Sequence, residues 1–255
     1  MEINIIDILQ GSLSLIFVLI SFVIGISIIS KYGKYKNRLY ILVGLTWLML
    51  STLWLPEAVS FLMSLIIRQT LAIEWYFILG NVFVPVALFC WVVAYTDMVN
   101  KEKEKIAVAL ILIFSVVFEG LFFYNFVLDI DFIGVIDDRQ PFSADLGIFL
   151  AILLLISILI LFVTGIMFAR KSIKSENKEV RLKGKLLQFA FIAFTIAAVL
   201  EKTIRSILMG IVFLNPTEIF LSVVLVVVRL LLISSTIAFY GGFLLPNWMK
   251  NLFTK

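Results

Sequence analysis

The sequence predicts an all-α integral membrane protein, a bundle of seven transmembrane helices, and three observations lead to this fold class. Of the 255 residues, 62% are hydrophobic and only 15% are charged, whereas soluble domains are about 45–50% apolar and about 25% charged. The mean hydropathy is +1.13. Seven apolar runs are each long enough to cross a hydrocarbon core of about 30 Å, which takes about 20 helical residues.

The expected spans follow one another through the chain, and we expect residues 1–255 to form a single transmembrane domain without a soluble domain. The spans are Ile8–Ser30, Leu39–Ile67, Trp75–Thr96, Ile106–Leu128, Leu146–Ala169, Leu186–Leu214 and Ile219–Pro246. The first residues are acidic rather than basic, which is not typical of a cleaved signal peptide. We therefore expect the first span to stay in the mature protein.

Two of the spans contain a proline in their interior. Pro56 lies in the second span and Pro85 in the third. A proline inside a helix has no backbone N–H to donate, so it frees the carbonyl four residues earlier and bends the helix. We therefore expect bends near Pro56 and Pro85, with the carbonyls of Thr52 and Asn81 released.

The basic residues predict the orientation. Most of the 21 Lys and Arg residues lie in the loops between spans one and two, three and four, and five and six, or in the tail. The opposite loops hold only Arg68 and Arg139. By the positive-inside rule, we expect a multi-pass protein of the cell membrane with the N-terminus outside and the C-terminus in the cytoplasm. This bias explains the net charge of +4, so no nucleic-acid partner is expected.

Two loops allow more than one interpretation. The outside loop Asp129–Asp145 has five aspartates around Arg139. It is either a solvated acidic loop or a lid that attracts cations or gates a pocket. The basic loop Arg170–Lys185 either contacts a cytoplasmic or membrane signalling partner or anchors the bundle on anionic lipid.

Two counts exclude several kinds of chemistry. The chain has no histidine and one cysteine, Cys90. His-ligated metal sites, histidine acid–base catalysis, thiolate clusters and a disulfide within the chain are therefore excluded. We expect no cofactor, no metal ligand and no catalytic residue, and we expect that the protein is not an enzyme.

The most informative residues are the charges inside the spans. Each costs about 2.5–3.5 kcal/mol at a helix centre on insertion scales, so we expect these side chains to face the bundle interior and to pair. Three are acidic and three are basic. With Ser222, which lies seven residues before Arg229 and on the same helix face, they form the candidate ligand-binding set: Glu57, Glu119, Glu201, Lys202, Arg205, Ser222 and Arg229. A purely structural salt-bridge network is the alternative.

Two stretches in the first half carry a family resemblance. They are KNRLYILVGLTWLMLSTLWLPEA (residues 36–58) and VPVALFCWVVAYTDMVNKEKEK (residues 84–105). Together they resemble the seven-helix sensor region at the N-terminus of some prokaryotic histidine kinases, over residues 31–105. The chain departs from that family because it has no kinase domain. The resemblance implies a stand-alone sensor whose output passes to another protein.

Four functional hypotheses follow. The first is a receptor-like sensor in a bacterial or archaeal cell membrane. It would bind a small or lipid-like ligand in a polar pocket of the outer half and signal to a partner protein. The second is a small proton- or ion-coupled transporter or channel, because intramembrane acid–base pairs also serve transport. The third is a membrane enzyme, which the missing histidine disfavours. The fourth is a structural or assembly subunit.

Overall fold

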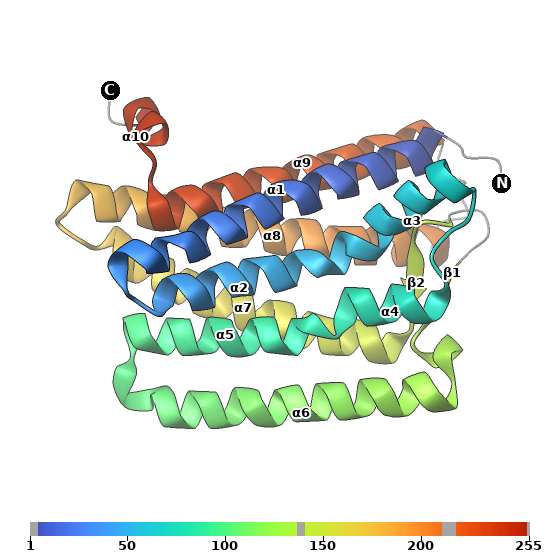
Figure 1. Ribbon diagram of the computed structural model, residues 1–255, viewed down its shortest axis with the longest axis horizontal. Helices are drawn as coiled ribbons and strands as arrows, with labels where there is room; N and C mark the ends of the chain where they lie inside the picture. Colours follow the sequence, from blue (N-terminus) through green and yellow to red (C-terminus); the bar gives the residue numbers. More distant parts are fainter. Residues whose placement is uncertain (1–4, 137–140, 211–217, 254–255) are drawn as a thin grey trace.

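The computed structural model describes residues 5–136, 141–210 and 218–253, and it gives the backbone but not the side chains of residues 202–210, 218–221 and 253. The chain runs back and forth as long, roughly parallel helices (Figure 1). These helices are α1 (Ile5–Tyr35), α2 (Leu39–Ser51), α3 (Leu55–Ile67), α4 (Ile73–Asn81), α5 (Phe83–Val99), α6 (Glu104–Leu128), α7 (Ile148–Ile173), α8 (Lys178–Gly210), α9 (Glu218–Leu244) and the short α10 (Asn247–Phe253).

Seven spans within the described ranges are long and apolar enough to cross a membrane, as the sequence predicts. Helices α2 and α3 together form the second span, and α4 and α5 form the third. The predicted start of the fifth span was wrong, because Leu146 belongs to a β-strand and α7 begins at Ile148. The predicted end of the sixth span, Leu214, lies outside the described residues.

The seventh span ends two residues earlier than predicted, and the sequence analysis missed the helix that follows it. Helix α9 ends at Leu244, because Leu245 adopts a left-handed backbone with φ of 42° and Pro246 comes next. Helix α10 then leaves the bundle at a steep angle (Figure 1). Met249 of α10 is buried, whereas Trp248 is exposed, so α10 packs one face on the end of the bundle.

Six of the spans form a closed ring. Along this ring α1 packs on α2, α2 on α5, α5 on α7, α7 on α8, α8 on α9, and α9 returns to α1. Glycines bring α1 and α2 close together, since a Cβ on Gly44 would stand 2.7 Å from the carbonyl oxygen of Gly25. Helix α6 is not part of the ring and lies beyond α5 (Figure 1).

Both predicted bends are present. Between α2 and α3 the helix tightens into a 3-10 turn, η1 (Thr52–Trp54), and the backbone N–H of Leu55 donates to the carbonyl of Thr52. That carbonyl would bond residue 56 in a regular helix, but Pro56 has no N–H to donate. In the third span, the regular helix is interrupted at Val82, three residues before Pro85.

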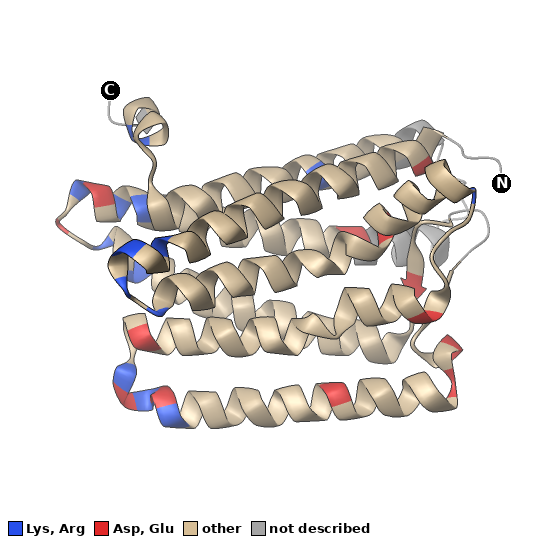
Figure 2. Cartoon of the chain, viewed as in Figure 1, with Lys and Arg blue, Asp and Glu red and all other residues tan. Residues whose placement is uncertain are grey.

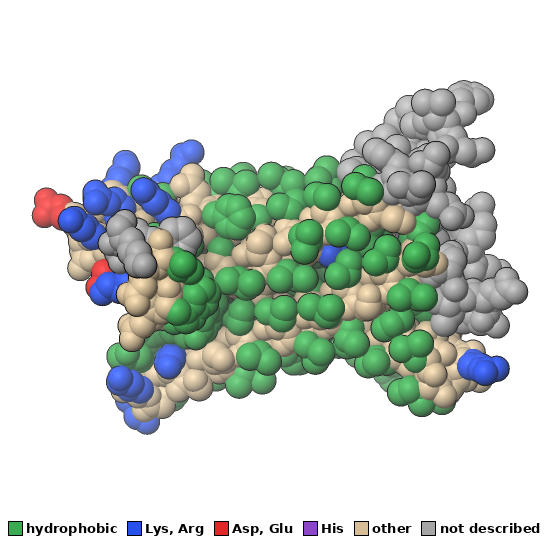
Figure 3. Space-filling model, turned by 90° about the horizontal axis from the view of Figure 1, so that it is seen from above, with side chains coloured by type: hydrophobic (Ala, Val, Ile, Leu, Met, Phe, Trp, Pro, Cys, Tyr) green, Lys and Arg blue, Asp and Glu red, His purple; other side chains and the backbone are tan. Residues whose placement is uncertain are grey.

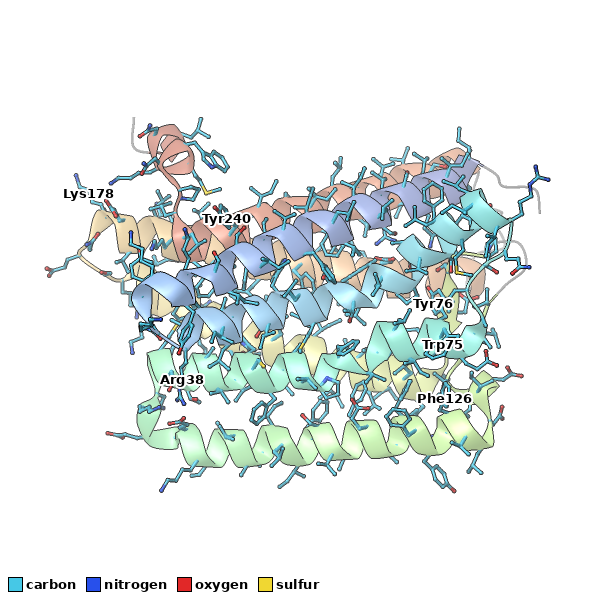
Figure 4. All side chains as sticks on the ribbon, viewed as in Figure 1. Arg38, Trp75, Tyr76, Phe126, Lys178 and Tyr240 are labelled. Carbon is cyan, nitrogen blue, oxygen red and sulfur yellow. The ribbon has the colours of Figure 1, made fainter. Side chains whose placement is uncertain are left out.

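A small folded cap covers one end of the bundle. It contains the 3-10 turn η3 (Ile130–Phe132) and the antiparallel strands β1 (Gly134–Ile136) and β2 (Ala144–Leu146). The Tyr76 hydroxyl accepts a hydrogen bond from the backbone N–H of Ala144 at 3.2 Å, and the Phe142 side chain is buried. The loop that the sequence analysis interpreted as solvated or as a lid is therefore partly packed on the bundle, at the end where Figure 4 shows Tyr76.

The two ends of the bundle differ in charge. Lys and Arg gather at the end where α1 passes into α2, which we call the basic end, and the opposite end carries the cap and is called the hairpin end (Figure 2). Between the two ends, the face in Figure 3 is covered mainly by hydrophobic side chains. Such a belt indicates helices that contact a lipid bilayer.

At the basic end, an exposed network of ion pairs connects the start of α2 with α5 and α6. The Arg38 guanidinium donates to both carboxylate oxygens of Asp97, at 2.8 and 2.7 Å, and to Glu104 at 3.2 Å. Lys101 bridges Asp97 and Glu104. The hydrogen bonds to Asp97 raise the pKa of Arg38 above its ordinary value. Figure 4 shows Arg38 at this end.

Candidate functional site

The site is built around Arg229, in the middle of α9. It is the one charged residue between Ile219 and Pro246 in the sequence. Its side chain is only 2% exposed, so it faces the ring interior as the sequence predicts. A guanidinium at that depth needs acceptors, because an unpaired buried charge is strongly unfavourable.

Two carboxylates from two other spans supply these acceptors. Nη1 and Nη2 of Arg229 donate to the two oxygens of Glu201 on α8, at 3.1 and 2.8 Å, which is the bidentate geometry that suits a guanidinium. Nη2 also donates to Oε2 of Glu57 on α3, at 2.5 Å. Glu57 is 1% exposed and Glu201 is 15% exposed, so the more accessible carboxylate is Glu201.

Two further side chains hold the carboxylates in place. The Ser14 hydroxyl of α1 donates to Oε2 of Glu57 at 2.7 Å. The indole N–H of Trp54, in η1, donates to Oε2 of Glu201 at 2.7 Å. We call Ser14, Trp54, Glu57, Glu201 and Arg229 the Arg229 cluster. It connects α1, the bend between α2 and α3, α8 and α9 through polar bonds alone.

The bend near Pro56 positions two members of the cluster. Trp54 ends the 3-10 turn and Glu57 lies in the first turn of α3, so the two side chains come from the same distorted segment. Acidic side chains are favoured in the first turn of a helix, because the free backbone N–H groups carry partial positive charge. The bend thus places an aromatic donor and a carboxylate side by side in the ring.

Buried polar side chains extend from the cluster along the ring interior. They come from α1, α3 and α9 and are Gln10, Ser14, Ser21, Ser60, Ser64 and Thr236. The contact between the Ser21 and Thr236 hydroxyls, 3.5 Å apart, lies furthest toward the basic end. We call the part of the ring on the hairpin side of this contact the hairpin half and the other part the basic half.

The basic half is filled with aromatic rings. Trp47 stacks on Phe239 with ring centroids 4.0 Å apart, and Phe239 contacts Phe191 and Phe243. Trp91 adds contacts to Phe191. The buried hydroxyl of Thr46 in this half donates to a carbonyl of its own helix, Leu42, at 2.8 Å. The polar interior therefore gives way to a packed aromatic cluster toward the basic end.

The structure brings together three of the predicted site residues, Glu57, Glu201 and Arg229. Glu119 does not join them, because α6 lies outside the ring. Ser222 lies on α9 and is half-buried. The side chains of Lys202 and Arg205 lie outside the described residues.

Sequence reasoning did not assign Ser14 and Trp54 to the site. Ser14 carried a signal, because Asp7, Gln10, Ser14 and Ser21 mark one face of the first span. Trp54 carried a weaker one, its position three residues before Glu57. Its contact with Glu201 joins residues 147 positions apart, so no local pattern could predict that bond.

No known protein family and no curated protein matches this chain. The resemblance of residues 31–105 to the sensor regions of histidine kinases therefore stays a prediction.

Proposed function

We propose that the protein is a seven-helix membrane sensor. A small or lipid-like ligand reaches the hairpin half from the hairpin end, rearranges the Arg229 cluster, and thereby shifts α9 relative to the rest of the ring. The observation that carries this proposal is the double attachment of Arg229, which ties α9 to both α3 and α8 through one guanidinium.

The cluster is suited to such a role because its bonds can be exchanged. An anionic ligand group would compete with the carboxylates for Arg229, and a cationic group would compete with Arg229 for the carboxylates. Either competition loosens α9. A ligand shifts a conformational equilibrium only by its differential affinity for the two states, and a charged group that breaks or remakes a buried ion pair supplies such a difference.

Polar contacts connect the end of α9 and the following α10 to the start of α8 at the basic end. Lys183 near the start of α8 donates to the carbonyl of Phe243 at 3.2 Å, and Lys250 of α10 is ion-paired with Glu179 of α8. A shift of α9 would therefore change how α10 meets the basic segment Arg170–Lys185. The sequence predicts a loop there, but the structure shows the end of α7, a turn at residues 174–177 and the start of α8. In this proposal that segment presents the change to a partner protein on the cytoplasmic side.

Spin labels test the coupling between the cluster and the basic end. In a Cys90→Ser background, labels at Lys103→Cys and Trp248→Cys report the distance between the start of α6 and α10 in lipid nanodiscs. We expect the pair Glu57→Gln and Glu201→Gln, which weakens both attachments of Arg229, to shift or broaden this distance distribution. Glu119→Gln, outside the cluster, should leave it unchanged. An identical distribution in the folded double variant would contradict the proposal.

A transporter is the second candidate, and the polar interior of the hairpin half is the observation that favours it. Alternating access requires that the basic half also opens, but aromatic rings fill that half. Thr236→Cys, in the Cys90→Ser background, separates the two functions. A sensor predicts that an impermeant thiol reagent labels this cysteine from the hairpin side or not at all. Labelling from the basic side, together with proton uptake into proteoliposomes, would establish the transporter.

A further inference from the structure

Helix α6 is the least covered of the seven spans. Only 17% of its apolar window is buried, against 33–61% for the other six. Its buried side chains, Ile111, Phe118 and Phe122, form a single stripe. This stripe packs on α5 and on the start of α7, where Phe118 and Phe122 join a cluster with Leu150 and Leu153.

Glu119 lies at the edge of that stripe. Its Oε2 atom is buried, and the side chain forms no hydrogen bond or ion pair with the residues that the structure describes. It lies about 22 Å along α6 from Glu104, at 1.5 Å per residue. An acidic side chain at membrane depth is unfavourable, and it usually pairs with another polar group.

The exposed neighbours of Glu119 have the spacing of a helix-packing surface. Leu112, Val116, Glu119 and Phe123 repeat at intervals of four and three residues, which places them along one side of α6. The three apolar members are exposed. Beside them, a Cβ added to Gly120 would meet nothing within 4 Å, so another backbone can approach closely there.

We propose that this face of α6 binds a transmembrane helix of a partner protein, and that the helix carries a lysine or arginine at the depth of Glu119. Charge complementarity selects this partner. The basic side chain would neutralise the Glu119 carboxylate, which pairs with no side chain in the described part of the chain, while the apolar residues of the partner cover Leu112, Val116 and Phe123. The proposal does not depend on the proposed function, since either a sensor or a transporter can bind such a subunit.

The same charge argues against a second copy of this chain. A twofold pairing through α6 would bring two Glu119 carboxylates together, and like charges in a low-dielectric environment repel. A lipid neighbour would leave the carboxylate unpaired. A partner helix with a cation is therefore the occupant that this surface fits.

A synthetic peptide tests the proposal directly. The probe is a donor-labelled, leucine-rich transmembrane peptide with one arginine at the depth of Glu119, and the matched peptide has glutamine in its place. The protein carries an acceptor at Lys103→Cys in the Cys90→Ser background, and energy transfer is measured in phosphatidylcholine vesicles. Polar contacts between model transmembrane helices contribute about 1–2 kcal/mol, so we expect the arginine peptide to bind at least about fivefold more tightly.

Three variants decide the outcome. Glu119→Gln should abolish the preference for the arginine peptide, Glu119→Asp should keep it, and Gly120→Leu should weaken the binding of both peptides. Because Gly120 is exposed and Glu119 makes no polar contact with the residues that the structure describes, the variants should melt like the parent protein. Equal binding of the two peptides to the parent protein would overturn the proposal, and so would a preference that survives Glu119→Gln. Energy transfer between copies of the protein that Gly120→Leu removes would place a second copy on this face instead, and it too would overturn the proposal.

Discussion

The hairpin half and the basic half of the ring are formed by the same six spans but differ in what fills them. The hairpin half contains an ion-paired arginine with hydroxyl and amide side chains, whereas stacked aromatic rings fill the basic half. Ion pairs can exchange partners with water or a ligand, but close-packed rings lose contacts when they move. The bend at η1 carries Trp54 of the Arg229 cluster, and the bend at Val82 lies toward the hairpin end of its span. The difference teaches that the hairpin half is the part of the bundle suited to rearrangement.

Removing the Arg229 guanidinium should lower the free energy of unfolding more than any other substitution considered for the two halves. Arg229→Met leaves Glu57 and Glu201 close together without their cation, and breaking a buried ion pair typically costs about 3–5 kcal/mol. We expect a loss of that size in the free energy of unfolding, measured in detergent micelles by circular dichroism. The triple variant that adds Glu57→Gln and Glu201→Gln should recover much of the loss. A triple variant as unstable as Arg229→Met would show that the two carboxylates are not the cause.

Truncating one aromatic ring of the basic half should lower the free energy of unfolding by less than Arg229→Met does. In water-soluble cores Phe→Ala or Trp→Ala costs about 3–5 kcal/mol. Because lipid reduces the transfer contribution, we expect about half of that for Trp47→Ala or Phe239→Ala, measured in the same way. A double-mutant cycle should give a coupling of about 0.5–1.5 kcal/mol from the stacked rings. Strict additivity of the two substitutions would mean that the stacking makes no separate contribution.

The two carboxylates of the cluster should not be equivalent. Glu201→Gln replaces two charge-assisted acceptors of Arg229 by one neutral amide oxygen, whereas Glu57→Gln weakens a single charge-assisted bond to the guanidinium. Hydrogen bonds to charged groups contribute about 1.5–3 kcal/mol, so both variants should lose stability in this range, and Glu201→Gln should lose more. The comparison is made by unfolding at one pH and one salt concentration. The opposite ranking would show that burial of Glu57 outweighs the number of bonds.

Weakening the ion network at the basic end should change the free energy of unfolding least. Arg38 is 56% exposed, and exposed salt bridges contribute about 0–1 kcal/mol. We expect Arg38→Gln to lower the free energy of unfolding by less than about 1 kcal/mol, and high salt to reduce the difference further. The measurement is unfolding in low and high sodium chloride. A loss as large as that of Arg229→Met would remove the contrast between the two ends.

The seven spans could be predicted from the sequence because lipid excludes unpaired polar backbone, so spanning helices need long apolar runs. The two bends were also predictable, since Pro56 and Pro85 act on their own helices. The hairpin and the start of α7 at Ile148 were not, because strand pairing between residues 134–136 and 144–146 depends on a tertiary fold against Tyr76. Helix α10 is too short for hydropathy to detect.

The site was predictable in its members but not in its pairing. Glu57 and Glu119 look alike in the sequence, since each is the one charged residue of its apolar run. Only the packing of the helices separates them, because α3 contacts α1 inside the ring and α6 lies outside it. A local pattern indicates that a charge inside a span needs a partner, whereas the identity of that partner follows from how the ring closes.

The closure of the ring by α9 has a consequence for how the protein is made. Helix α9 is the last of the seven spans to emerge during synthesis, and on its own it would carry an arginine into the bilayer at a cost of about 2.5–3.5 kcal/mol. By then the segments with Glu57 and Glu201 have already been translated. Those carboxylates are the acceptors that Arg229 finds in the folded bundle, so we expect stable insertion of α9 to depend on the earlier insertion of α3 and α8.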